Sequence, residues 1–268
     1  MSRLSDLVVL IKGAGEAASA IAHRLHRAGF KVCVTELANP LAVCRGSCYS
    51  EAIYEKIKTI EDVTSELVPV DVNEINRVWK EEGIPLVIDP DMTVKNLIKP
   101  DVLIDATMTK RKTKISMNDA PLVVGLGIGF TAGKDVHILV ETHQGNNLGR
   151  VLFEGEAEKD TREPVVIGGL TFGRILWAER EGVFKTDCEI GEYVESGQVI
   201  AWMDDEPLKA PVDGILRGLI RGGFKVPANA KLIEVDPVND RSVIDSIRDK
   251  HRAIAGGVLE AIMYKYNR

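Results

Sequence analysis

The sequence has little of what marks secreted, membrane-spanning or nucleic-acid-binding proteins. Its four cysteines in 268 residues show no regular spacing, which favours a reducing compartment over a disulfide framework. Its apolar runs, such as residues 7–11, are far shorter than the roughly 18 residues that a membrane span requires. The start of the sequence shows no signal-peptide cleavage region, and a net charge of −6 argues against a surface for nucleic acid or anionic membrane. We therefore expect a cytoplasmic globular protein without a nucleic-acid or membrane partner.

Four stretches of the chain differ in their pattern of apolar residues. Residues 1–118 alternate strand-like and helix-like segments, which is typical of βαβ units and a parallel sheet. The helices expected here are "EAASAIAHRLHRAG", ended by Gly29, and "DVNEINRVWKEEG", a capped helix that begins at Asp71. Residues 119–164 form a glycine-rich middle segment that ends in a charged linker, "EGEAEKDTREP". Residues 165–237 carry short strands and turns. Residues 238–268 are helical, with two stretches separated by Gly256-Gly257.

An internal repeat organises the third stretch. Residues 176–204 align without a gap on residues 208–236, 32 positions later, with turn glycines and apolar positions in phase. Two equal strand-rich units predict a small β-sandwich, and "APVDG" is typical of biotin- and lipoyl-carrying domains. Those domains place a lysine seven residues before the Ala-Pro, where this chain has Met203, whereas Lys209 directly precedes the Ala-Pro. We therefore expect an α/β protein with an N-terminal Rossmann-like parallel-sheet domain, a C-terminal all-β barrel-sandwich hybrid that is not used as a carrier, and a final helix.

The motif "GAGEAA" follows the first predicted strand and begins a helix. Gly13 would allow a tight turn, Gly15 would let the backbone approach a phosphate, and a helix N-terminus favours negative charge. Glu36 ends the next strand, 21 residues after Gly15, where an acid commonly binds a ribose hydroxyl. The alternative is a tight turn that binds nothing. The predicted ligand site comprises Gly13, Ala14, Gly15, Glu16, Ala18 (small enough for close helix–strand contact) and Glu36.

Two further segments are candidates for binding anions. Lys110 and Arg111 begin a basic run, "KRKTK", that follows the strand "VLID". Ligands bind beyond the strand ends of open parallel sheets, although a charge run is also what a solvated surface shows. Gly125, Gly127 and Gly129, in "GLGIGFTAG", could expose N–H groups as an anion nest or could only form an irregular turn.

Two sets of potential metal ligands are present, and neither predicts a metal site. His137, Glu141 and His143 share one face if "DVHILVETH" is a strand, which suits the polar side of a cleft better than a metal centre. Cys44 and Cys48 lie in a predicted loop and lack a second cysteine pair, so a structural zinc site is not expected. No catalytic residue is predicted.

The segments "LIKGAGEAASAIAHRLHRAGFKVCVTEL", "APLVVGLGIGFTAGKDVHILVETHQGNNLGRV" and "IAGGVLEAI" resemble the YqeB-type accessory proteins of selenium-dependent molybdenum hydroxylase systems. The resemblance extends over nearly the whole chain, including the lysine-free region. It implies a Rossmann-like fold akin to the XdhC/CoxI group, and a maturation factor or cofactor chaperone rather than a metabolic enzyme. It assigns no role to Cys44, Cys48 or His143.

The motifs and the resemblance together predict a ligand that bears phosphate. A molybdopterin-type cofactor and NAD(P) both meet this description, and the sequence does not choose between them. The favoured function is a maturation factor that binds such a cofactor and has the apo form of a molybdenum hydroxylase as its partner. The alternative is an NAD(P)-dependent oxidoreductase built on the same Rossmann unit. Whether the protein forms homo-oligomers is left open.

Overall fold

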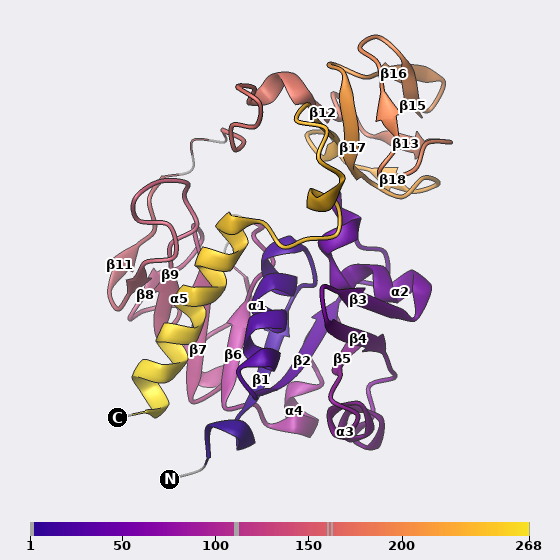
Figure 1. The fold of residues 1–268 in the computed structure, drawn as a ribbon. Coiled ribbons are helices and arrows are strands. Elements are labelled where there is room, and N and C mark those ends of the chain that lie inside the picture. Colours follow the sequence, from indigo (N-terminus) through magenta and orange to yellow (C-terminus); the bar gives the residue numbers. More distant parts are fainter. Residues whose placement is uncertain (1–2, 110–112, 160, 162, 268) are drawn as a thin grey trace. The chain divides into compact units, whose positions relative to one another are not determined.

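The computed structural model describes residues 3–109, 113–159, 161 and 163–267, and the chain divides into two compact units (Figure 1). Unit 1 contains Met1–Pro40, Cys48–Asp160 and Ile247–Arg268. Unit 2 contains Leu41–Ser47 and Thr161–Ser246. The segment boundaries predicted at residues 118, 164 and 237 describe the sequence pattern and stay predictions.

A nine-stranded mixed sheet forms the centre of unit 1, in the order β10-β9-β7-β6-β1-β2-β5-β4-β3. The strands from β9 to β4 run parallel, whereas β10 and β3 are antiparallel strands at the two edges. Two more strands, β8 (Thr131–Ala132) and β11 (Gly155–Glu156), pair separately. The nine strands are β1 Val8–Lys12, β2 Lys31–Glu36, β3 Ile57–Ile60, β4 Val63–Leu67, β5 Ile84–Ile88, β6 Val102–Asp105, β7 Leu122–Leu126, β9 Ile138–Val140 and β10 Val151–Leu152.

Two helices of unit 1 have an end at the residue that the sequence predicts. α1 (Glu16–Arg27) follows the glycine motif and ends before Gly29, whose φ of +89° is a conformation that glycine adopts readily. α3 (Val72–Lys80) begins after Asp71, whose carboxylate accepts hydrogen bonds from the first turn. The other α-helices are α2 Ala52–Glu55, α4 Lys95–Ile98 and α5 Asp249–Tyr266. The 3-10 helices are η1 Leu4–Asp6, η2 Arg45–Ser47, η3 Tyr49–Glu51, η4 Met117–Asp119, η5 Phe172–Arg174 and η6 Arg241–Val243.

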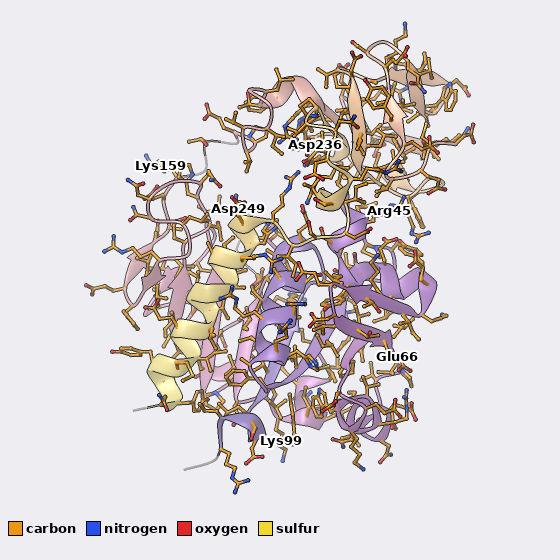
Figure 2. The ribbon with its side chains drawn as sticks, in the orientation of Figure 1. Arg45, Glu66, Lys99, Lys159, Asp236 and Asp249 are labelled. Atoms are coloured by element: carbon orange, nitrogen blue, oxygen red, sulfur yellow. The ribbon has the colours of Figure 1, made fainter. Side chains whose placement is uncertain are left out.

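Two hydrophobic clusters cover the opposite faces of the sheet. Side chains alternate along β1, so Val9 and Ile11 belong to one cluster and Leu10 to the other. α1 and α5 lie side by side over the Val9 face (Figure 1). α3 packs on the other face, and its Arg77 forms an ion pair with Glu66 of β4 at 2.6 Å. Glu66 is labelled in Figure 2.

α5 runs without interruption through Gly256-Gly257, where two separate helical stretches were predicted. A Cβ at Gly257 would lie 2.1 Å from the carbonyl oxygen of Gly149 and 2.9 Å from a methyl carbon of Val140. The glycine therefore lets the helix pack closely against the chain beneath it. This contact offsets the cost of about 1 kcal/mol that glycine carries in a helix.

Unit 2 consists of two four-stranded antiparallel sheets, in the orders β12-β19-β17-β14 and β16-β15-β13-β18. Adding 32 to the first residues of β13, β14 and β15 (182, 193 and 199) gives those of β17, β18 and β19 (214, 225 and 231), so the sequence repeat is also a structural repeat. Residues 41–47 join this unit, because the N–H of Leu219 donates to the carbonyl oxygen of Val43 at 2.9 Å. The strands are β12 Ile175–Trp177, β13 Gly182–Lys185, β14 Tyr193–Val194, β15 Val199–Met203, β16 Glu206–Lys209, β17 Gly214–Leu219, β18 Lys225–Val226 and β19 Lys231–Asp236.

The predicted fold class, a Rossmann-like parallel-sheet domain followed by a biotinyl/lipoyl-like barrel, is wrong. The large sheet is mixed, because the β3–β4 hairpin and the β9–β10 pair add antiparallel strands at its edges. Residues 122–152, predicted to stand outside the parallel sheet, extend that sheet, and α5 packs on it as well. The small unit has two separate antiparallel sheets. The protein is an α/β protein with a mixed sheet and several antiparallel sheets.

Candidate functional site at the start of α1

The glycine motif forms the connection between β1 and α1. Gly13 has a φ of +96°, and its N–H donates to the carbonyl oxygen of Thr35 at 2.8 Å. Gly15 is the N-cap residue of α1, with a φ of −71° and no capping side chain. A Cβ built on Gly15 would meet no atom within 4 Å. The helix start is therefore uncapped and has open space in front of the residue where a phosphate was predicted.

Glu36 points back to this loop. Its carboxylate accepts hydrogen bonds from the N–H of Ala14 and the N–H of Leu37, both at 2.7 Å. Burial raises the pKa of Glu36, and the two N–H bonds oppose that rise. The acid thus fixes the loop conformation and occupies one of the N–H donors of the loop.

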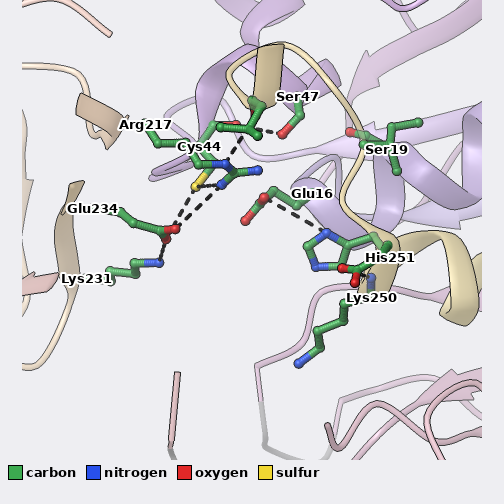
Figure 3. A network of polar contacts seen from close by, with 12 residues as sticks. Glu16, Ser19, Cys44, Ser47, Arg217, Lys231, Glu234, Lys250 and His251 are labelled. Atoms are coloured by element: carbon green, nitrogen blue, oxygen red, sulfur yellow. Dashed lines mark hydrogen bonds and ion pairs between the residues drawn. The ribbon is translucent and has the colours of Figure 1, made fainter. Parts of the chain in front are cut away.

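The remaining residues of the motif have different surroundings. Ala18 is fully buried in the core beneath α1, as its small size suggested. Glu16 lies in the first turn, with its carboxylate 3.9 Å from Nδ1 of His251 on α5 (Figure 3). A carboxylate in the first turn stabilises the helix but repels an anion at the same end. A protonated His251 would reduce that repulsion.

Two buried polar atoms beside the loop have no hydrogen-bond partner in the part of the chain that the structure describes: Ser50 Oγ and Asp105 Oδ2. Ser50 lies next to the loop, because its N–H donates to the carbonyl oxygen of Ala14 at 3.0 Å. Asp105 ends β6, the strand beside β1. Sequence reasoning missed both residues. Part of the signal for Asp105 was present in "VLID", an apolar strand that ends in an acid, but the pairing of this strand with β1 could not be read from the sequence.

The second glycine-rich loop, after β7, is filled by its own neighbours. A Cβ on Gly125 would lie 2.8 Å from the ring of Phe130, and one on Gly127 would lie 2.2 Å from Oγ1 of Thr142. The N–H of Gly127 donates to the carbonyl oxygen of Val140 at 2.9 Å, so it is not available to an anion. Gly129 has a φ of +106°. Packing explains Gly125 and Gly127, and the anion nest stays a prediction.

The predicted polar face of residues 137–143 is engaged internally. Glu141 is buried, and its carboxylate accepts hydrogen bonds from the N–H groups of Thr142, His143 and Glu158, each at 2.7 Å. Nδ1 of His137 accepts from the N–H of Val123 at 3.0 Å, and burial together with Lys265 lowers the pKa of His137. Glu141 therefore fixes the loop after β9.

Lys110 and Arg111, predicted to bring positive charge to the site, lie outside the described residues. The described part of the chain does contain one group of metal-ligand type, formed by His23, Glu61 and Asp62. Arg27 pairs with Asp62 at 2.5 Å, and Arg252 pairs with Glu61. Both carboxylates thus neutralise arginines, which is the simpler reason for their position.

The two cysteines predicted to lie in a loop are buried thiols. Cys44 belongs to unit 2, where its sulfur lies 2.7 Å from Nη1 of Arg217 and 3.7 Å from Oε2 of Glu234 (Figure 3). Glu234 also pairs with Arg174 at 2.9 Å and with Lys231. This buried cluster of charges was not anticipated from the sequence.

Within the described residues, the structure contains no helix that is both long and apolar enough to cross a membrane.

A scan against models of known protein families finds no match. A curated relative, "Uncharacterized protein YqeB" of Escherichia coli strain K12, is 36% identical over 256 residues. The alignment covers 96% of this chain. This is a YqeB-type chain. It spans 47% of the length of the E. coli relative, whose name assigns no activity.

Solved structures give weaker similarities. The product-bound ectoine utilization protein EutE (DoeB) of Ruegeria pomeroyi has a TM-score of 0.27 at 9% identity, covering 86% of this chain and 85% of that one. A succinylglutamate desuccinylase of Silicibacter sp. TM1040 has a TM-score of 0.25 at 13% identity, covering 86% and 84%. An aspartoacylase family protein of Mesorhizobium loti has a TM-score of 0.27 at 14% identity, covering 86% and 85%. We infer neither fold nor activity from similarities of this size.

Proposed function

We propose that unit 1 binds a phosphate-bearing ligand, a nucleotide or a molybdopterin-type cofactor, at the start of α1. The observation that carries this proposal is the N-cap Gly15, which has no capping side chain and no atom within 4 Å of the position of a Cβ. The first N–H groups of a helix have no partners within the helix, and they carry the positive end of its dipole. A bound anion would accept hydrogen bonds from these N–H groups and interact favourably with the helix dipole.

The proposed biological role is that of a cytoplasmic maturation factor or cofactor chaperone for a selenium-dependent molybdenum hydroxylase. The YqeB kinship supports this role, together with the family resemblance of the glycine motif and the middle segment. Kinship to the XdhC/CoxI group belongs to the same proposal. The partner would be the apo-hydroxylase, and the ligand at α1 would be its molybdenum cofactor or a precursor. A net charge of −6 supports a small ligand and a protein partner over nucleic acid.

Native mass spectrometry of the protein purified from its own host tests the ligand class. We expect a species heavier than the apo chain, and release of a phosphate-containing molecule on denaturation. A pterin in the released fraction would identify a molybdopterin-type ligand, whereas a nicotinamide would favour the oxidoreductase alternative.

Disruption of the gene in the same host tests the role. The apo-hydroxylase should accumulate without molybdenum cofactor. Normal hydroxylase activity and normal molybdenum content in the disrupted strain would contradict the maturation role.

A further inference from the structure

Asp105 lies at the same edge of the sheet as the glycine loop. β6 and β1 are parallel neighbours, and their register places Asp105 opposite Lys12, the residue that precedes Gly13. The backbone that follows Asp105 touches the loop: a Cβ on Gly13 would lie 3.3 Å from Cα of Thr107 and 3.4 Å from the carbonyl of Ala106. The end of β6 that carries Asp105 is therefore adjacent to the loop of the proposed phosphate site.

Only one oxygen of this carboxylate is satisfied. Oδ1 accepts hydrogen bonds from the N–H of Thr107 at 3.1 Å and from its hydroxyl at 2.6 Å. Oδ2 has no partner, although Asp105 is only 1% exposed. Lys12, the basic residue opposite it in the register, makes no ion pair within the described ranges. A buried carboxylate oxygen without a partner is costly, and it marks a position where a hydrogen-bond donor or a cation would be stabilising.

The position of this carboxylate conflicts with an anion site unless a cation lies between them. A phosphate at the start of α1 and a charged Asp105 repel each other. Magnesium resolves such a conflict, because it binds through one or two carboxylates, phosphate oxygens and several waters. In P-loop NTPases an aspartate holds the magnesium ion beside a glycine-rich phosphate loop. Val102, Leu103 and Ile104 form a buried apolar run before Asp105, which gives this chain a comparable arrangement.

We propose that Asp105 holds a divalent cation of the magnesium type, which links its Oδ2, directly or through water, to a phosphate group at the Gly13–Gly15 loop. This inference rests on the proposed phosphate site and specifies its ligand. The protein binds a metal–phosphate complex, and the metal-free ligand binds more weakly. The class of ligand is a diphosphate or longer phosphate ester that chelates magnesium.

Calorimetric titration of the full chain with ADP as probe, in excess Mg²⁺ and in EDTA, tests this proposal. We expect wild type to bind ADP at least about tenfold more tightly in Mg²⁺. Asp105→Asn should bind with less than about a twofold difference between the two conditions, and in EDTA at least as tightly as wild type. Asp91→Asn is the matched control, because Asp91 is an exposed acid in the turn after β5. It should keep the wild-type Mg²⁺ dependence.

A second readout separates metal binding from a structural role. The electron paramagnetic resonance signal of free Mn²⁺ should fall on addition of wild-type protein with ADP by more than ADP alone produces. Asp105→Asn should abolish that excess. Asparagine can still accept both bonds from Thr107 through its amide oxygen, so the variant should unfold at the wild-type temperature or above it. An unchanged Mg²⁺ dependence in Asp105→Asn, at any stability, overturns the proposal.

The outcomes for wild type distinguish this inference from the proposed function. Equal ADP affinity in Mg²⁺ and in EDTA would overturn the metal site and leave the phosphate site standing. The absence of ADP binding under both conditions would overturn the phosphate site, and the metal site with it.

Discussion

The two glycine-rich loops of unit 1 look alike in the sequence and differ in what surrounds them. The first, at Gly13–Gly15, leads into a helix whose N-cap has no side chain and no neighbour within 4 Å of a Cβ. In the second, after β7, the Phe130 ring lies against Gly125 and the Thr142 hydroxyl lies against Gly127. Glycine is required in the second loop for packing. In the first loop, the absence of a side chain at Gly15 leaves space for a ligand.

The polar groups near the two loops also differ in whether they have hydrogen-bond partners. The N–H of Gly127 is paired with a strand carbonyl, and Glu141 satisfies three N–H groups after β9. Beside the first loop, Ser50 Oγ and Asp105 Oδ2 are buried and have no partner among the described residues. Buried polar groups are nearly always paired in native proteins. This difference is the reason for proposing the binding site at the first loop.

The largest expected effect on stability is at the second loop. Gly127→Ala places a Cβ 2.2 Å from Oγ1 of Thr142 at a φ of +61°. Overpacking and the unfavourable φ should together lower the free energy of unfolding by about 2–4 kcal/mol. Urea denaturation measures this loss. The double variant Gly127→Ala/Thr142→Ala should regain part of it, and a single variant as stable as wild type would show that this loop can accept a side chain.

A smaller effect is expected at Glu36, which holds the first loop. Because burial raises the pKa of Glu36, the native state keeps this proton at a pH where the unfolded chain has lost it. The free energy of unfolding should therefore fall as pH rises through the window between the ordinary and the raised pKa. Glu36→Gln should lack this component. Unfolding measured from pH 4 to pH 7 in both proteins gives the difference, and a difference that grows with pH in favour of wild type contradicts the assignment.

The smallest effect on stability is expected at Gly15. The φ of −71° is open to any residue, and aspartate is a favourable N-cap. Gly15→Asp should therefore raise the free energy of unfolding slightly, and the change should not exceed about 1 kcal/mol. Gly173→Asp is the matched control, because Gly173 also has no atom within 4 Å of a Cβ and has no left-handed φ. A large loss of stability in Gly15→Asp alone would mean that the space before α1 is not open.

The sequence predicted the elements that local signals define. Asp71 marked the start of α3, Gly29 marked the end of α1, and the 32-residue repeat reappears in the strands of unit 2. The mixed sheet escaped prediction because strand direction is decided by pairing between distant segments. The turn of the β3–β4 hairpin contains Glu61, a non-glycine residue with a φ of +53°. Because this turn has no Asn-Gly or Gly-Gly pair, the sequence did not predict a hairpin here.

The candidate site was predicted in part. The position of Gly15 followed from the motif, but the partner of Glu36 did not, because a backbone N–H carries no sequence signal. Gly125 and Gly257 show the same limit: their neighbours, Phe130 and Gly149, became visible only when the chain was folded. Asp105 differs from these residues. The sequence shows both its strand and the acid at the end of that strand, but it does not show that this strand pairs with β1.

The most direct test of the account is a titration of ADP in excess Mg²⁺ into wild type, Gly15→Asp and Gly173→Asp. In Gly15→Asp the new carboxylate would take up the N–H donors at the start of α1 and repel the phosphate. We expect at least tenfold weaker binding, equivalent to about 1.4 kcal/mol, in a protein that unfolds like wild type. Gly173→Asp should bind ADP as wild type does. Equal affinity in a folded Gly15→Asp protein would contradict the account, because the start of α1 would then be only a turn.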